Sequence, residues 1–155
     1  MGTGDTGGIL SLEPRDCWAL LRTSDVGRLA VNVRGEPDIF PVNFVVDHGS
    51  IVFRTASGTK LAFAVIGGKV AFEADGYDAD SKLAWSVVLK GPAHPIENLH
   101  EFLDAARLPL FPWHDSPKNN FVRVEPEEIT GRRFPVVDQD RWRTDFTDAH
   151  GIAPE

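Results

Sequence analysis

Three strand-like segments in the first third of the chain are separated only by short turns, and this pattern constrains the fold more than any other feature. The segments are Val26–Val33, residues 38–47 and Ser50–Thr55, and the turns between them carry Gly35 and Gly49. Strands joined by such short turns run antiparallel, because a parallel connection needs a long crossover. The sequence therefore predicts an antiparallel meander.

Further strand-like and helical segments follow the same kind of pattern. More strands are predicted at residues 69–74, at 83–96 with a bend at Gly91 and Pro92, and at 119–125 with a kinked continuation to Phe134. Helices are predicted at residues 11–23 with Ser11 as the cap, at 59–66 and at 97–107, and a polar loop at 75–82. Six antiparallel strands with short helices are typical of a small barrel, so we expect a mainly β protein of the α+β type.

The length and composition of the chain indicate one folded domain. The chain has 155 residues, of which 42% are hydrophobic and 25% charged, enough for one domain with a core. We expect this domain over residues 11–135, a flexible tail over residues 1–10 and a second tail over residues 136–155.

Charge and cysteine content narrow the classes of partner and compartment. The net charge of −7 argues against nucleic acid as the main partner, because a phosphate backbone attracts basic surfaces. We expect no membrane contact and no leader, since no apolar run approaches membrane-spanning length. The single cysteine, Cys17, excludes an intrachain disulfide and fits a reducing compartment. These observations predict a cytoplasmic protein.

A predicted strand that runs into a small-residue turn and then a helix is the main candidate for a binding site. Hydroxyl and cationic side chains gather at this turn, namely Arg54, Ser57, Thr59 and Lys60. Unpaired N–H groups at a helix start, hydroxyls and cations all suit a phosphate group. The alternative is an ordinary helix cap followed by a solvated lysine, and the spacing leaves both interpretations open.

Other catalytic patterns are weak in this sequence. The five histidines are scattered, and none has a metal-ligand spacing with Cys, Asp or Glu. Ser86 lacks the sequence of a nucleophile elbow. The acidic residues from Glu73 to Asp80 lack the spacing of a calcium loop and are more typical of a solvated turn. We predict no metal site, and the sequence assigns no catalytic residue.

The order of the motifs resembles one known family. The motifs are the predicted helix at 12–21 and the segments 26–30, 37–44, 53–55, 58–61, 70–73, 85–88 and 129–133. Their order and spacing resemble the pyridoxamine-phosphate-oxidase-like flavin-binding split-barrel proteins, especially the actinobacterial branch. The resemblance covers residues 11–135.

The resemblance implies a six-stranded antiparallel split β-barrel of the FMN-binding type, and a homodimer with flavin mononucleotide (FMN) at the subunit interface. The family's phosphate site falls on Arg54, Thr55, Ser57, Thr59 and Lys60. Its flavin-ring contacts fall on Pro41, Val42, Asn43 and Phe44, and on Trp85 and Ser86. The family's usual glycine before that tryptophan is Ala84 here.

The implied function is an FMN-dependent oxidoreductase that acts on an unknown small molecule. The flavin supplies the chemistry in such proteins, so no acid–base side chain is obligatory. Two alternatives remain: a reductase of the same fold that uses a deazaflavin coenzyme, and a flavin- or heme-binding module without turnover. Relatives that bind the longer acidic deazaflavin coenzyme need a more basic groove, which ranks this alternative below FMN.

Several of these positions have simpler interpretations. Asn43 can satisfy a strand edge, Trp85 can belong to the barrel core, and we favour a surface ion pair for Arg28. For the dimer, the strand segments at residues 40–46 and 87–89 are apolar on both faces. A small barrel covers only one face of each strand, so the sequence predicts that the other face is buried between subunits.

Overall fold

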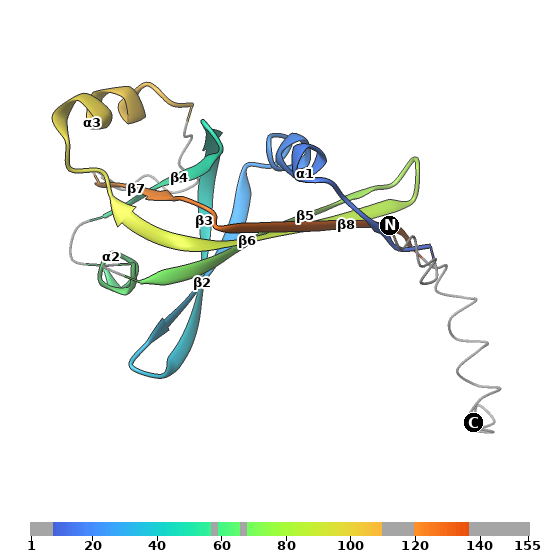
Figure 1. Ribbon diagram of the computed structural model, residues 1–155, viewed down its shortest axis with the longest axis horizontal. Helices are drawn as coiled ribbons and strands as arrows, with labels where there is room; N and C mark the ends of the chain where they lie inside the picture. Colours follow the sequence, from blue (N-terminus) through green and yellow to red (C-terminus); the bar gives the residue numbers. More distant parts are fainter. Residues whose placement is uncertain (1–7, 57–58, 66–67, 110–119, 137–155) are drawn as a thin grey trace.

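The structure is a computed structural model that describes residues 8–56, 59–65, 68–109 and 120–136. These parts of the chain contain eight strands and three short helices (Figure 1). In chain order the elements are β1 (Leu10–Ser11), α1 (Pro14–Leu21), β2 (Val26–Val33), β3 (Glu36–Asp47), β4 (Ser50–Thr55), α2 (Lys60–Ala64), β5 (Lys69–Asp78), β6 (Leu83–Pro95), α3 (Leu99–Ala106), β7 (Asn120–Val124) and β8 (Glu128–Pro135).

Six strands close into an antiparallel barrel, as predicted. Neighbouring strands pair in the order β6-β5-β2-β3-β4-β7, and β7 pairs again with β6 to close the ring. The predicted meander is β2–β3–β4. Its two turns place Arg34 and Gly35, and then His48 and Gly49, at positive φ. Two successive residues at positive φ form the hairpin turn that matches the twist of the strands.

Strand β6 is shared between the barrel and an extension. Residues 83–90 of β6 pair with β8, whereas residues 93–95 pair with β7 on the same edge. The partner changes at Gly91 and Pro92, where the sequence predicts a bend. Gly91 is required there because a Cβ atom would collide with the carbonyl oxygen of Glu125. Figure 1 shows β5, β6 and β8 continuing beyond the barrel, with α1 along this extension.

Two of the predicted strand boundaries are wrong. β7 and β8 are separate strands rather than one kinked strand. The N–H groups of Glu125 and Glu127 between them donate to the carbonyls of Pro92 and Lys90 on β6, at 3.1 and 2.8 Å. β5 continues to Asp78 instead of ending before a polar loop, because β6 stays in register with it through Asp78 and Leu83.

The predicted start of the first helix is also wrong. Ser11 lies in β1, opposite Arg132 of β8, and does not cap a helix. α1 begins at Pro14, whose missing N–H is harmless in a first turn. Cys17 of α1 is fully buried, and its Sγ lies 2.6 Å from where a Cβ on Gly131 of β8 would be. Gly131 therefore lets α1 pack closely on the extension.

The other two helices sit at the barrel. α2 has five residues and ends before the predicted residue 66, which lies outside the described residues. α3 lies against the outside of the barrel (Figure 1), and its start is capped by Asn98, whose side chain accepts from the N–H groups of His100 and Glu101. Buried Val52 and Phe121 of the barrel wall form a small apolar cluster on this side.

The main core fills the barrel and takes one face of each strand. Its largest fully buried side chains include Phe53, Phe72, Leu29 and Leu89. The rings of Phe44 and Phe72 meet edge to face, with centroids 4.8 Å apart. Among the described residues, no helix combines the length and the apolar character needed to cross a bilayer.

Candidate functional site

The turn after β4 is held together by its own hydroxyl groups. The hydroxyls of Thr55 and Thr59 lie 3.0 Å apart, and Thr59 donates to the carbonyl of Ala56 at 2.8 Å. Thr59 also accepts from the N–H of Ala62 at 3.2 Å and so caps α2. Both threonines therefore support the backbone around Lys60. Ser57, which the sequence predicts in the same phosphate site, lies outside the described residues.

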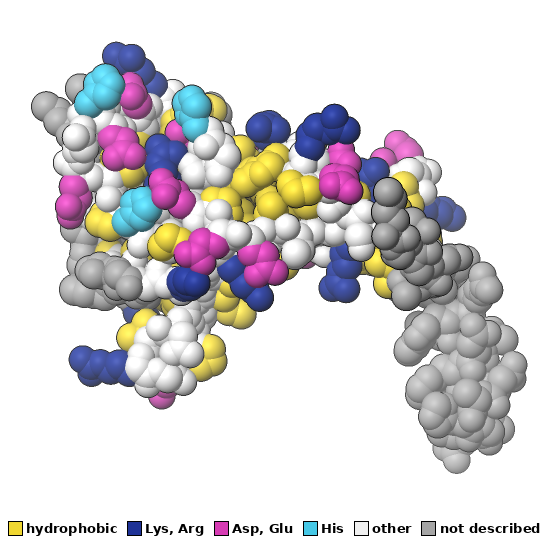
Figure 2. Space-filling model, viewed as in Figure 1, with side chains coloured by type: hydrophobic (Ala, Val, Ile, Leu, Met, Phe, Trp, Pro, Cys, Tyr) yellow, Lys and Arg dark blue, Asp and Glu magenta, His cyan; other side chains and the backbone are white. Residues whose placement is uncertain are grey.

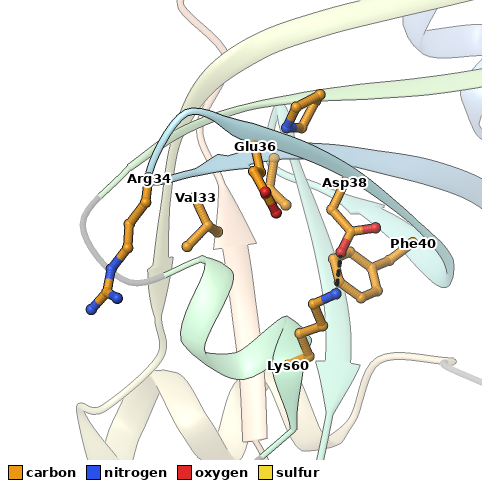
Figure 3. Close-up of a pocket in the computed structure, with 8 residues that line it drawn as sticks. Val33, Arg34, Glu36, Asp38, Phe40 and Lys60 are labelled. Atoms are coloured by element: carbon orange, nitrogen blue, oxygen red, sulfur yellow. Dashed lines mark ion pairs between the residues drawn. The ribbon is translucent and has the colours of Figure 1, made fainter.

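Lys60 reaches from the first residue of α2 toward β3. Its Nζ lies 2.8 Å from Oδ2 of Asp38, and Figure 3 shows this ion pair crossing from the helix to the strand. The Lys60 side chain is 80% exposed. The hydrogen bond to Asp38 raises the pKa of Lys60. The negative charges of Asp38 and Glu36 raise the pKa of Lys60 further. Lys60 is therefore a fully charged and accessible cation.

Arg54 points to a different part of the barrel. Its guanidinium lies over the ring of Phe121 on β7, with Cζ 5.1 Å from the ring centroid. Thr55, the next residue along β4, is buried. Successive side chains of a strand point to opposite faces, so Arg54 lies on the outer face while Thr55 lies inside. Arg54 therefore lies on the outer face of β4 and makes a cation–π contact there.

The four predicted ring contacts on β3 divide between two faces of the strand. Val42 and Phe44 are buried in the barrel core, so their side chains are not available to a ligand. Pro41 is exposed and Asn43 is half-buried on the opposite face. The side-chain amide of Asn43 donates a long hydrogen bond of 3.4 Å to the carbonyl of Asp25. From this segment, only Pro41, Asn43 and backbone atoms are placed to meet a ligand.

Strand β3 changes its hydrogen-bonding partner between Asn43 and Phe44. Its pairing with β4 covers only four residues, from Phe44 to Asp47, and the residues before Phe44 pair with β2. β4 continues past Phe53, but Arg54 and Thr55 pair with β7. β3 and β4 therefore diverge at this point. The ring segment and the turn that carries Lys60 lie on the two sides of the divergence.

A hollow of about 420 Å³ lies beside the ion pair, between the β2–β3 hairpin and α2 (Figure 3). It is lined by Val31, Val33, Arg34, Glu36, Pro37, Asp38, Phe40 and Lys60. In Figure 3, Arg34 points away from the ion pair, whereas Glu36 lies on the same side of the hairpin as Asp38. An exposed ammonium beside a hollow with apolar walls suits a phosphate group attached to a larger organic molecule.

Trp85 and Ser86 occupy opposite faces of β6. Trp85 packs on the core and covers Gly76, where a Cβ would lie 2.7 Å from Cε2 of the indole. Trp85 is partly buried and also lines the hollow described below, so its position is compatible with both interpretations. Ser86 lies on the outer face and accepts from Nε of Arg132 at 3.3 Å. It lines a second hollow, of about 510 Å³, on the outer face of β5, β6 and β8.

Arg28 forms the surface ion pair that the sequence favours. Its Nη1 lies 3.1 Å from Oε2 of Glu73 and 3.2 Å from Oδ1 of Asp75. Burial and the neighbouring Asp75 raise the pKa of Glu73 above its usual value, while Arg28 lowers it. The ion-pair cluster of Arg28, Glu73 and Asp75 therefore lies on the outer face of the sheet.

Asp38 is the functional candidate that the sequence did not single out. It lies on the same face of β3 as Phe40, which packs against the core. A carboxylate on the face of β3 that also carries the core residues Phe40, Val42 and Phe44 is unusual, and this is the signal that identifies it.

Comparisons with known proteins agree with the barrel. Residues 13–133 match the family model described as pyridoxamine 5'-phosphate oxidase. An uncharacterized protein of Mycobacterium tuberculosis is 33% identical over 131 residues, 81% of this chain and 86% of that protein.

Two solved structures show the same similarity. The FAD binding protein from Mycobacterium smegmatis superposes with a TM-score of 0.72 at 40% identity, over 81% of this chain and 98% of that one. A proposed pyridoxamine 5'-phosphate oxidase of Corynebacterium glutamicum gives a TM-score of 0.75 at 37% identity, over 87% and 100%. The chain, with its split barrel, therefore belongs to the pyridoxamine 5'-phosphate oxidase family.

Proposed function

We propose that this protein binds FMN at Lys60 and is an oxidoreductase that acts on a small molecule. The observation that carries the proposal is the position of Lys60, an exposed cation that meets Asp38 of β3 beside the hollow of about 420 Å³. The phosphate would bind Lys60, and the flavin ring would lie along the backbone of β3 near Pro41 and Asn43. Family membership supports the same assignment.

The flavin supplies electron transfer when it is bound, and the residues of this chain have simpler tasks. Lys60 holds the phosphate, and Thr55 and Thr59 keep its turn in place. Asn43 orients the ring edge through its side-chain amide. The substrate and the electron donor are not specified by these contacts. A store or sensor that binds flavin without turnover would use the same residues.

FAD is a second candidate for the cofactor. The Mycobacterium smegmatis relative is an FAD binding protein, and FAD carries the same first phosphate as FMN. The hollow of about 420 Å³ beside Lys60 offers apolar walls for a nucleoside. A deazaflavin coenzyme fits less well, because its acidic tail would meet the carboxylates of Glu36 and Asp38.

We also propose a homodimer that buries the outer face of the sheet formed by β3, β2, β5, β6 and β8. In the apolar segment 87–89 of β6, Val87 and Leu89 lie in the core. Val88 therefore lies on the outer face of the sheet. Ile39 on β3 is 65% exposed. Figure 2 shows hydrophobic side chains on the flanks of the β2–β3 hairpin. Ile39 and Val33 of this hairpin are among the exposed large hydrophobic residues. A second copy of the chain would cover Ile39 and Val88.

The proposal is tested by identifying the cofactor and then removing Lys60. Mass spectrometry of the purified full-length protein is expected to detect FMN. Lys60→Ala is expected to weaken FMN binding about ten- to a hundredfold, because a charge-assisted hydrogen bond contributes about 1.5–3 kcal/mol. Riboflavin lacks the phosphate, so its affinity is expected to stay the same. An equal loss for both ligands in calorimetry would show that Lys60 does not bind the phosphate.

Turnover separates the oxidoreductase from a flavin store. The FMN-loaded protein is expected to oxidise a reduced nicotinamide when an electron acceptor is present. A yellow protein that binds FMN through Lys60 but shows no turnover with a panel of donors would support the store or sensor.

A further inference from the structure

The proposed phosphate-binding cation already has an anionic partner within the chain. Nζ of Lys60 lies 2.8 Å from Oδ2 of Asp38, a distance typical of a charge-assisted hydrogen bond. The two groups come from different elements, α2 and β3, and Figure 3 shows their side chains extended toward each other. Asp38 therefore occupies a donor direction of Lys60 that a phosphate oxygen would use.

The surroundings of Asp38 allow its carboxylate to separate from Lys60. The Asp38 side chain is 35% exposed, so water can solvate it after the ion pair breaks. Its Oδ1 also accepts from the N–H of Ile39 at 2.9 Å, which holds the carboxylate in place independently of Lys60. Glu36 lies two residues away on the same face of β3 and adds a second negative charge near Lys60.

We propose that Asp38 is an internal competitor of the ligand's phosphate group for Lys60, and that it sets the affinity of the site for phosphorylated flavin. This inference rests on the proposed function. In the empty site Asp38 neutralises Lys60 and ties the β2–β3 hairpin to α2. When the phosphate binds, it replaces the carboxylate on Lys60, and the hairpin loses this link to the helix.

The charges of the two competitors explain why the phosphate wins. A phosphate monoester carries about −1.5 to −2 charges near neutral pH, whereas a carboxylate carries one. Breaking an exposed ion pair costs little, because water solvates both charged groups once they separate. The displaced carboxylate stays close and repels the phosphate. Both effects lower the affinity for phosphorylated flavin, and neither acts on riboflavin.

The test compares two variants that remove the same charge from the same face of β3. Asp38→Asn keeps an oxygen for the N–H of Ile39 but cannot pair with the ammonium. Glu36→Gln is the matched control, because no ion pair between Glu36 and Lys60 is found among the described residues. Binding of FMN and of riboflavin to the full-length apo-protein is measured by calorimetry for both variants, for Lys60→Ala and for the double variant of Asp38 and Lys60.

We expect Asp38→Asn to lower the FMN dissociation constant about three- to tenfold and Glu36→Gln to lower it less than twofold. Riboflavin binding is expected to be unchanged in both variants. In the Lys60→Ala background, the gain from Asp38→Asn is expected to shrink to less than twofold, because the competition requires the ammonium.

The failure of this inference is distinguishable from the failure of the proposed function. If Lys60→Ala weakens FMN binding but Asp38→Asn leaves it unchanged or weakens it, the competition is wrong and the phosphate site stands. An equal gain from Glu36→Gln also overturns the competition, because it would show only a general effect of charge. If wild type and Asp38→Asn both fail to bind FMN, the proposed function and this inference are both wrong.

Discussion

Arg123 on β7 fastens the turn between β3 and β4, because its Nη1 lies 3.0 Å from Oδ2 of Asp47. The same Nη1 donates to the hydroxyl of Ser50 at 2.6 Å. The side chain of Arg123 is only 12% exposed, so its charge depends on these partners. This contact holds the β3–β4 hairpin against the strand that closes the barrel.

Removing the carboxylate of Asp47 is expected to destabilise the fold. Asp47→Ala would leave the largely buried guanidinium of Arg123 with only the longer ion pair between its Nε and Oε1 of Glu101, at 3.5 Å. The expected cost is about 1–3 kcal/mol in the free energy of unfolding. Urea denaturation measures the loss. His48→Asn is the control, since His48 also contacts Asp47 but is 92% exposed, and asparagine tolerates its positive φ. The control is expected to change stability by less than about 0.5 kcal/mol.

Gly27→Ala is expected to strain the barrel where β2 faces β5. A Cβ on Gly27 would lie 2.8 Å from the carbonyl oxygen of Glu73 and would overlap the ring of Phe72. Overpacking of this kind costs about 1–3 kcal/mol. Thermal denaturation is expected to show a lower midpoint for this variant. Gly68→Ala introduces the same methyl group with nothing within 4 Å and is expected to leave the midpoint nearly unchanged. A similar midpoint for both variants would contradict the close packing at Gly27.

The ionisation of Glu73 is expected to give stability a measurable dependence on pH. Burial and Asp75 raise the pKa of Glu73 above 4.5, so the folded state holds this proton to a higher pH than the unfolded state. The contribution is therefore complete below about pH 4.5 and is lost as the pH rises through the raised pKa. At pH 7, Glu73→Gln is expected to be more stable than wild type, by less than about 1 kcal/mol.

The stability difference between Glu73→Gln and wild type is expected to shrink when urea denaturation is repeated at pH 4. Arg28 keeps Asp75 as a partner in this variant, at 3.2 Å. A gain of the same size at both pH values would show that the change acts through packing rather than through ionisation.

The proposed dimer is tested by placing a charge on each of the two faces of the β2–β3 hairpin. Ile39→Lys puts a charge on the face that we expect to be buried between subunits, which is expected to weaken association at least tenfold. Val33→Lys makes the same kind of change on the opposite face of the hairpin, where Val33 is 44% exposed, and is expected to leave the dimer intact. Light scattering at micromolar concentration measures both. A monomeric wild-type protein would rule out the dimer and a flavin site shared between subunits.

The local sequence pattern predicted where the strands lie, whereas tertiary contacts determine where each strand ends. Apolar segments bounded by turn residues marked the barrel strands, with alternation in residues 26–33. The break between β7 and β8 depends on hydrogen bonds from Glu125 and Glu127 to β6, which no local pattern reports. The same holds for β1, whose two residues pair with β8 far along the chain.

The candidate site was predictable in part. The residue types at the turn identified Lys60, and the structure places its ammonium at the surface. Alternation along β4 could also have placed Arg54 on the outer face of the strand, since the inward positions are Phe53 and Thr55. The partnership of Lys60 with Asp38 depends on how the β2–β3 hairpin lies against α2, and residues from two elements meet there only in the folded chain.

The late position of β7 in the sequence has a consequence during synthesis. β7 fills the place between β4 and β6 and is made after both of them. Until it leaves the ribosome, the nascent chain has a sheet with two open edges, each offering unpaired N–H and C=O groups to other chains. Closing the ring also joins segments distant in the sequence, which slows folding. The period between the synthesis of β6 and that of β7 is therefore when this protein is most prone to aggregate.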